Sequence, residues 1–326
     1  MSGLKCKHIT LLVTNRCDLK CRNCYVNQGA ADFPQEYFEV RVLEPLKRLG
    51  GSSIGFSGGE PLLHPSILQM IEKSAGSGLV TSLVTNGMSL DTSRIQALEQ
   101  AGLNRLQISL DGARKDSNDT VRGEGVFEKV TQEVLPLLHY SKIKVTLVAT
   151  PNPWLLKELD EYISLAVRLK IKYIYFRRCV SGGVLDDEKR RLYREFLVKI
   201  LKLQKEYARN LTIMCGDPLI VLERDITPNK KMFAGCAAGV TSLAVNESGK
   251  IMPCTRLPVE LGNVSEDKLE TIWKEHEVLK KLRFRCLEGQ CGDCSYQYLC
   301  GGCRADAYFY QGNYLADDPL CSLYEF

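Results

Sequence analysis

The sequence lacks a long hydrophobic run, and this absence argues against a membrane span. Its longest apolar stretches have the length of β-strands, whereas a transmembrane helix needs about 20 apolar residues. The N-terminus, MSGLKCKHIT, also lacks the apolar core of a signal peptide. We therefore expect a cytoplasmic protein without a membrane partner.

An excess of charge of one sign is also missing. The 326 residues include 43 Lys and Arg and 39 Asp and Glu, so the formal net charge is only +4. Domains that bind nucleic acid usually carry a concentrated positive charge, and we expect no nucleic-acid partner here. Apolar residues make up 44% of the sequence, which suffices for the core of one large domain or of two.

Cysteine, in contrast, is abundant: the sequence has 14. Their C-x2-C spacings, in a chain without a secretion signal, indicate metal or cluster ligation more than disulfides. The first group, Cys17, Cys21 and Cys24, follows a C-x3-C-x2-C pattern in TNRCDLKCRNCYVN. Three thiolates on one short loop can hold three irons of a [4Fe–4S] cluster and leave the fourth iron open. A structural zinc loop is the alternative, but such sites take four protein ligands.

Strand-like and helix-like patterns alternate along the first two thirds of the chain. The β-rich runs are His8–Thr14, Ser53–Phe56, Val80–Thr85, Arg105–Leu110, Lys144–Ala149 and Lys172–Phe176. Each run precedes a segment with apolar residues three or four positions apart, such as Phe38, Val42 and Leu46. Six β/α units predict an α/β fold with a parallel sheet, either doubly wound or closed as a barrel.

The cysteine triplet after the first strand, and SGGEP at Ser57–Pro61 after the second, resemble the radical SAM enzymes. In that family the open iron binds S-adenosylmethionine, and the reduced cluster cleaves it to a 5′-deoxyadenosyl radical. The resemblance implies a partial (β/α)6 TIM-like barrel and an oxidoreductase or maturase activity. It also implies a reductant such as flavodoxin or ferredoxin.

The resemblance further implies which residues bind S-adenosylmethionine. Gly58, Gly59 and Glu60 are expected at its amino group, with Glu60 as the acidic partner; a Gly-Gly turn with a solvated Glu is the alternative. Glycines can also let the backbone lie against a ligand. Ser109 is expected near the ribose or the amino-acid part, and Arg122 at the carboxylate, although a surface arginine before a helix is common.

Two asparagines complete the expected cofactor site. Asn86 lies in the loop after the third strand. Asn23 precedes the third cysteine, where the family usually has an aromatic residue that borders the adenine. We therefore expect only a backbone contact at Asn23.

The later cysteines resemble the SPASM domain, which holds two auxiliary clusters, here expected to be [4Fe–4S]. We accordingly expect a barrel at residues 1–210 and a SPASM domain at residues 211–326. The implied ligands are Cys236, Cys254 and Cys303 for the nearer cluster, and Cys291, Cys294, Cys300 and Cys321 for the distal one. Cys215 is the favoured fourth ligand of the nearer cluster, ahead of Cys286 and of an open iron. Two residues separate Cys300 from Cys303 where the family has three, and a zinc ribbon is the alternative.

Cys179 follows the sixth strand, on the face where the radical would form. A thiol there could give a hydrogen atom to a substrate radical, as in peptide epimerases of the superfamily, although a lone cysteine is more often a small packed hydrophobe. Cys6 is expected to be an ordinary thiol. The leading substrate class is a peptide that is crosslinked, epimerised or oxidised. The alternative is a small molecule or tetrapyrrole, and a non-enzymatic electron-transfer protein comes last.

Overall fold

The computed structural model describes residues 5–180, 186–224, 226 and 235–323. In these residues ten strands form one sheet in the order β10-β9-β8-β1-β2-β3-β4-β5-β6-β7. The first six strands are β1 (His8–Thr14), β2 (Ser53–Gly58), β3 (Val80–Thr85), β4 (Arg105–Ser109), β5 (Lys144–Ala149) and β6 (Tyr173–Phe176). They are parallel and pair in sequence order, so the six predicted strands are confirmed, with ends that differ by two residues at most.

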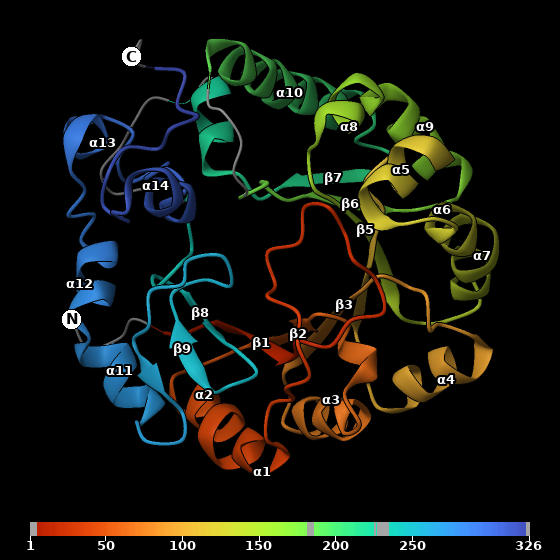
Figure 1. Ribbon diagram of the computed structural model, residues 1–326, viewed down its shortest axis with the longest axis horizontal. Coiled ribbons are helices and arrows are strands. Elements are labelled where there is room, and N and C mark those ends of the chain that lie inside the picture. Colours follow the sequence, from red (N-terminus) through yellow and green to blue (C-terminus); the bar gives the residue numbers. More distant parts are fainter. Residues whose placement is uncertain (1–4, 181–185, 225, 227–234, 324–326) are drawn as a thin grey trace.

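Helices surround this curved sheet on its outer side (Figure 1). They are α1 (Gln35–Tyr37), α2 (Glu44–Arg48), α3 (Ile67–Gly76), α4 (Thr92–Gln100), α5 (Lys115–Arg122), α6 (Val126–Glu128), α7 (Leu135–Leu138), α8 (Pro153–Lys157), α9 (Leu159–Arg168) and α10 (Asp187–Glu206). π-helical turns at Phe38–Leu43 and Lys129–Val134 join α1 to α2 and α6 to α7. Repeated parallel β/α units with helices outside confirm the predicted partial barrel.

The predicted apolar stripes pack between helices and sheet. Phe38, Val42 and Leu46 are 1% exposed or less, as expected. The same spacing also predicts buried positions at Val167, four residues after Ile163, and at Leu192, four residues before Phe196, but these two side chains are 42% and 37% exposed. An α-helix has about 3.6 residues per turn, so residues spaced three or four apart move gradually around its axis. The end of such a series can therefore lie on the solvent-facing side of the helix.

The C-terminal third extends the same sheet at both edges. β7 (Thr212–Cys215) pairs in parallel with β6, and β8 (Ser242–Val245) pairs in parallel with β1. β9 (Lys250–Met252) and β10 (Gly262–Asn263) continue from β8 as antiparallel strands. The remaining helices are α11 (Leu269–Glu275), α12 (Glu277–Arg283), α13 (Gly289–Asp293) and α14 (Arg304–Gln311), on the left of Figure 1. The boundary at residues 210 and 211 stays a prediction.

A buried ion cluster joins the end of β6 to the C-terminal third. Arg178 donates to Asp318 at 2.5 and 2.7 Å, lies 3.4 Å from Asp217, and also pairs with Asp306. All four residues are 2% exposed or less. Because three carboxylates share one guanidinium away from water, the cluster depends on Arg178.

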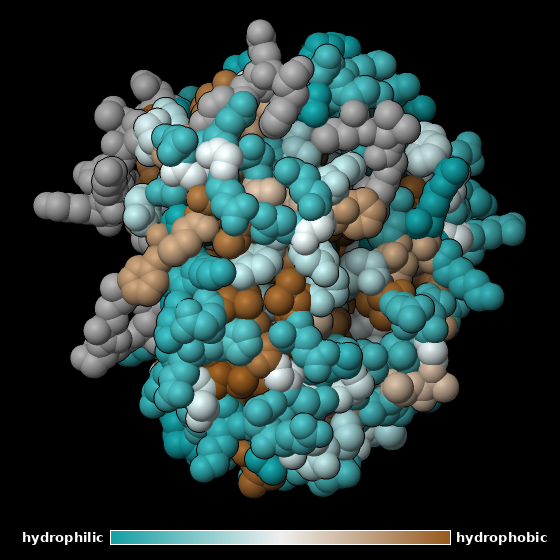
Figure 2. Space-filling model, turned by 60° about the vertical axis from the view of Figure 1, so that its left-hand side comes forward, coloured by the Kyte–Doolittle hydropathy of each residue, from teal (hydrophilic) through white to brown (hydrophobic). Residues whose placement is uncertain are grey.

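The surface is mostly hydrophilic in the view of Figure 2, apart from a hollowed central area where hydrophobic residues gather. In the part of the chain that the structure describes, no helix has the length and apolar character needed to cross a membrane.

Candidate active site

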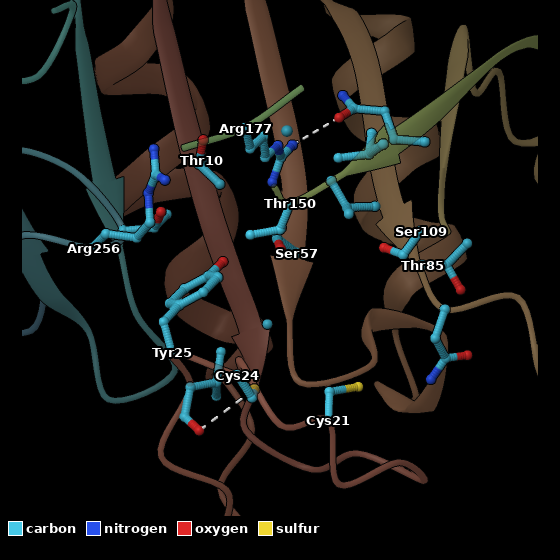
Figure 3. Close-up of a pocket in the computed structure, with 18 of the residues that line it drawn as sticks. Thr10, Cys21, Cys24, Tyr25, Ser57, Thr85, Ser109, Thr150, Arg177 and Arg256 are labelled. Atoms are coloured by element: carbon cyan, nitrogen blue, oxygen red, sulfur yellow. Dashed lines mark hydrogen bonds between the residues drawn. The ribbon is translucent and has the colours of Figure 1, made fainter. Parts of the chain in front are cut away.

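A cavity of about 470 Å³ lies inside the curved sheet (Figure 3). Alternate residues of a strand face opposite sides, and the inward positions of β1 to β6 line this space. They include His8, Thr10, Ser53, Gly55, Ser57, Val80, Ser82, Val84, Arg105, Gln107, Ser109, Val148 and Tyr175. Most of these side chains are polar or small, whereas a packed barrel is filled by bulky branched residues.

The loop after β1 closes one end of the cavity and brings Cys17, Cys21 and Cys24 to its wall. In Figure 1 this loop lies across the middle of the ring. Arg16 holds the start of this loop in place. Its guanidinium donates two hydrogen bonds to the Asp32 carboxylate, at 2.8 and 3.1 Å, and one to the Leu63 carbonyl at 2.7 Å. The structure therefore brings the three predicted cluster ligands to one space.

Gly58 and Gly59 pack the second loop against the cysteine loop. A Cβ at Gly58 would lie 2.2 Å from the Thr14 oxygen, and one at Gly59 would lie 2.1 Å from the Arg16 oxygen. Gly58 also has a φ of +143°, which favours glycine. The Gly59 and Glu60 amides donate to the same two oxygens, each at 2.8 Å. Both glycines line the cavity, but the close contact that requires them is with the protein backbone.

Glu60 is not among the residues that line the cavity, and its expected contact with the cofactor stays a prediction. Its carboxylate is fully buried and accepts hydrogen bonds from the Thr85 hydroxyl at 2.8 Å, the Asn86 amide at 2.9 Å and the Leu62 amide at 3.1 Å. Burial raises the pKa of Glu60 to about 7, although these hydrogen bonds act in the opposite direction. Glu60 therefore fixes the loop after β3 from behind the cavity wall.

Arg122, at the end of α5, lines the cavity beside the cysteine loop. Its Nη2 atom lies 2.8 Å from Oδ2 of Asp111, and its carbonyl accepts from the Cys21 thiol at 3.8 Å. The Nε atom of Arg122 is buried and has no hydrogen-bond partner among the described residues. An unpaired buried N–H is costly, and this one is available to an anionic ligand.

The other expected cofactor residues also line the cavity. Ser109 is buried at the end of β4. Asn86 donates to Oδ1 of Asp18 at 2.6 Å and accepts from the Met88 amide, which fixes its orientation. Asn23 lies on the cysteine loop wall, next to the 41% exposed Tyr25.

Cys179 lines the same cavity directly after Arg178, and it is half-buried. This position agrees with the face expected for it, and its role as a hydrogen donor stays a prediction. Cys6 is fully buried outside the cavity, and burial raises its pKa to about 12. The expectation that Cys6 is an ordinary thiol left a buried or a surface position open, and the structure has it buried.

Four of the later thiols line a second, smaller cavity beside α13, together with Leu219, Tyr296 and Asp318. They are Cys291, Cys294, Cys300 and Cys321, the four residues expected to share the distal cluster.

The thiols expected at the nearer cluster are more dispersed. Cys254 and Cys303 pack in one small apolar cluster with Leu257. The Cys236 amide donates to the Cys300 carbonyl at 3.4 Å. Cys215 packs against the main core at the end of β7, and burial raises its pKa to about 12. Cys215 as the fourth ligand stays a prediction.

The sequence analysis gave no role to two arginines that line the cavity. Arg177 follows β6 and donates to Oε1 of Gln107 at 2.7 Å. Arg256 follows Cys254 and donates to the carbonyl of Arg178. The polar residues at alternate positions of β1, β2 and β4 were the available signal, because they predict a polar interior.

Comparisons with known proteins decide the family. A family model described as the radical SAM superfamily matches residues 11–149, and one described as an iron–sulfur cluster-binding domain matches residues 236–304. An AdoMet-dependent heme synthase of Methanosarcina barkeri is 30% identical over 332 residues, which cover 95% of this chain and 94% of that protein. The chain belongs to the radical SAM superfamily.

Other relatives agree with this membership. An AdoMet-dependent heme synthase of Nitratidesulfovibrio vulgaris is 27% identical, over 97% of this chain and 92% of that protein. The structure of Streptococcus suis SuiB bound to S-adenosylmethionine has a TM-score of 0.78 at 18% identity and covers 98% of this chain and 78% of SuiB. Native anSMEcpe with bound AdoMet has a TM-score of 0.75 at 20% identity, over 96% and 94% of the two chains. At these identities the two structures support the fold.

As a radical SAM enzyme with an iron–sulfur domain, the protein uses iron–sulfur chemistry and S-adenosylmethionine, as predicted. The number of clusters and their ligands stay predictions. Within the described ranges, no three His, Cys, Asp or Glu side chains are grouped to hold a single metal ion. The residues nevertheless fit a larger cluster with a bound anion, because three thiols face one cavity and the unpaired Nε of Arg122 lies beside them.

Proposed function

We propose that this radical SAM enzyme converts a carboxylate-bearing tetrapyrrole into heme. The observation that carries the proposal is the charge of the cavity. Its described lining includes five arginines and a single acidic residue, Asp111. Arg122 and Arg178 form ion pairs with aspartates. The other three cavity arginines, Arg105, Arg177 and Arg256, have no ion-pair partner among the described residues.

These three guanidinium groups are positioned to receive acid groups of a ligand. Among the described residues, no carboxylate oxygen lies within 4.0 Å of a nitrogen of these three guanidinium groups. Arginine binds carboxylates through a planar fork of N–H donors, and this contact is strong where water is excluded. Tetrapyrroles of the heme series carry several propionate groups, so their charge complements this wall.

The relatives support the same substrate class. Two curated relatives that cover more than 90% of this chain are named AdoMet-dependent heme synthases. Peptide modification was the leading expectation, and SuiB has been solved with its precursor peptide SuiA. That likeness is at 18% identity and supports the fold alone, so the names of the closer relatives favour the tetrapyrrole.

We assign the thiols of Cys17, Cys21 and Cys24 to the radical cluster. When bound, this cluster and S-adenosylmethionine supply a 5′-deoxyadenosyl radical that can take a hydrogen atom from the substrate. Arg122 offers its free Nε to the carboxylate of S-adenosylmethionine, and Ser109 and Asn86 line the adjoining wall.

The net change at the substrate sets what the protein must provide. Converting a propionate, –CH2–CH2–COO⁻, into a vinyl group, –CH=CH2, releases CO2 and removes one hydrogen atom and one electron. The electron needs an oxidised acceptor. We assign this role to an auxiliary cluster held by the C-terminal thiols, of which Cys291, Cys294, Cys300 and Cys321 already line one cavity.

Turnover under anaerobic conditions tests the proposed function. Reconstituted enzyme, a reductant and S-adenosylmethionine would be incubated with iron coproporphyrin, which carries propionates in place of the two vinyl groups of heme. We expect heme and CO2, measured by mass spectrometry and absorbance, and no product with the Cys17, Cys21 and Cys24 triple alanine variant. Cleavage of S-adenosylmethionine without any change in the porphyrin, together with modification of an added peptide, would contradict the proposal.

A further inference from the structure

The active-site cavity continues well beyond the cysteine loop, into a part that we call the inner lumen. It is lined by inward residues of β1, β2, β3 and β4 and by one side chain that reaches in from the end of β6. Its residues are His8, Thr10, Ser53, Gly55, Ser82, Gln107 and Arg177. In Figure 3, Arg177 and Thr10 lie on the far side of Ser57 and Thr150 from Cys21 and Cys24.

Four of the wall positions of the inner lumen carry small residues, namely Thr10, Ser53, Gly55 and Ser82. Gly55 lies in the middle of β2 and lets His8 and Ser82 pack close to the strand, because a Cβ there would lie 3.1 Å from Oγ of Ser82 and 3.2 Å from Cε1 of His8. Barrels without a ligand in the interior normally fill it with branched apolar side chains. Small polar residues at these positions are typical of a space that receives a polar ligand.

Arg177 is a cation of the inner lumen, and its contacts there are neutral; the exposed Arg105 pairs in register with Ser82 and lines the same cavity. It donates to Oε1 of Gln107 at 2.7 Å, and its guanidinium lies 5.6 Å from the centre of the Tyr175 ring. Neither contact supplies a negative charge. A guanidinium in a mostly buried space gains more from an anion than from such partners.

His8 does not compete with Arg177 for an anion. Its Nδ1 atom lies 2.9 Å from the Ser53 hydroxyl and its Nε2 atom 3.1 Å from the Thr10 hydroxyl, so both nitrogens have partners. Burial, and then the nearby charge of Arg177, lower the pKa of His8 to about 4. The imidazole is therefore neutral at physiological pH, and the positive charge near it comes from arginine.

We propose that the inner lumen is a carboxylate subsite in which Arg177 binds one acid group of the substrate, while a second part of the substrate reacts beside the cysteine loop. Strands rise about 3.3 Å per residue, so the four steps from Thr10 to Thr14 span roughly 13 Å. A ligand held at both ends must be large and carry more than one acid group. The identity of that ligand as a tetrapyrrole rests on the proposed function.

Binding measurements on the holoenzyme test the subsite. Iron coproporphyrin and its tetramethyl ester would be titrated anaerobically in the presence of S-adenosylmethionine, and the dissociation constants read from the porphyrin absorbance. We expect Arg177→Gln to weaken binding of the acid by about tenfold or more and to change binding of the ester little. The affinity of Arg177→Lys for the acid should lie between those of the wild type and Arg177→Gln, because lysine keeps the positive charge but lacks the planar fork of donors.

The matched control is Arg114→Gln, which removes an exposed arginine that pairs with Glu161 outside the cavity. It should bind both porphyrins as the wild type does. Iron content and the unfolding midpoint of each variant establish that the protein is folded and loaded. Equal loss of acid and ester binding in Arg177→Gln, or no loss, would overturn the proposal.

A second variant probes the space without changing charge. Gly55→Val places a branched side chain against His8 and Ser82, and valine suits a strand. We expect weaker binding of the acid, because the inner lumen is then filled. Wild-type affinity in Gly55→Val would mean that the ligand does not enter the inner lumen.

The outcomes separate this inference from the proposed function. If no heme forms but porphyrin acids bind in a manner that depends on Arg177, the subsite stands and the proposed reaction fails. If heme forms and Arg177→Gln has an unchanged KM, the reaction stands and the subsite is wrong.

Discussion

Nη2 of Arg122 lies 2.8 Å from Oδ2 of Asp111, and this ion pair leaves Nε of Arg122 unpaired at the cavity wall. We expect Arg122→Lys to keep the ion pair and to weaken S-adenosylmethionine binding, since lysine lacks the second donor of the fork. A lost hydrogen bond to a charged group costs about 1.5–3 kcal/mol. Anaerobic titration calorimetry measures the affinity, and iron content should stay unchanged. Wild-type affinity would remove Arg122 from the cofactor site.

Glu60 provides the second prediction. Glu60→Ala leaves the Thr85 hydroxyl and the Asn86 and Leu62 amides without an acceptor, at a cost of about 1–3 kcal/mol for each buried donor. Glu60→Gln keeps a carbonyl acceptor and should lose less stability. Urea unfolding of the two variants measures the difference. If Glu60→Ala has wild-type stability and loses only cofactor affinity, then Glu60 contacts the cofactor directly.

The third prediction concerns the buried ion cluster. Arg178→Met leaves Asp217, Asp306 and Asp318 without their cation and should lower the free energy of unfolding by about 3–5 kcal/mol. Arg114→Met, which breaks the exposed pair with Glu161, should cost less than about 1 kcal/mol. Chemical unfolding compares the two variants. Similar losses would show that the cluster does not hold β6 to the C-terminal third.

His8 predicts a pH dependence of stability. The pKa of His8 is about 4 in the folded protein, whereas the ordinary value of 6.5 applies in the unfolded chain. Between pH 6.5 and 4, the unfolded chain therefore binds a proton at His8 and the folded protein does not. Stability should therefore fall as the pH decreases from 6.5 to 4, by up to about 3 kcal/mol from this group. Because glutamine does not titrate, the stability difference between wild type and His8→Gln should shrink over this range. A constant difference would mean that His8 titrates normally.

The strands of the barrel could be predicted because their buried residues are also residue types that favour β-strands. Ile9, Leu11 and Val13 face the helices and produce the apolar signal that gives β1 its correct bounds. The short strands β9 and β10 could not be found this way, since two or three residues carry no periodicity. They depend on pairing instead, β9 with β8 and β10 with β9.

The site was predictable where spacing alone determines it. The thiols of Cys17, Cys21 and Cys24 lie on one loop and therefore reach one space. The direction of the Glu60 side chain depends on donors at the end of β3, which are distant in sequence, so the sequence could not predict its burial. The direction of the Arg177 side chain depends in the same way on its hydrogen bond to Gln107, which is also distant in sequence.

Transfer of a hydrogen atom from substrate to cofactor tests the central claim most directly. Iron coproporphyrin with deuterium on its propionate side chains would be incubated with reduced enzyme and S-adenosylmethionine, and the 5′-deoxyadenosine analysed by mass spectrometry. We predict that 5′-deoxyadenosine gains one deuterium in parallel with heme formation. Unlabelled 5′-deoxyadenosine together with unchanged porphyrin would contradict the account.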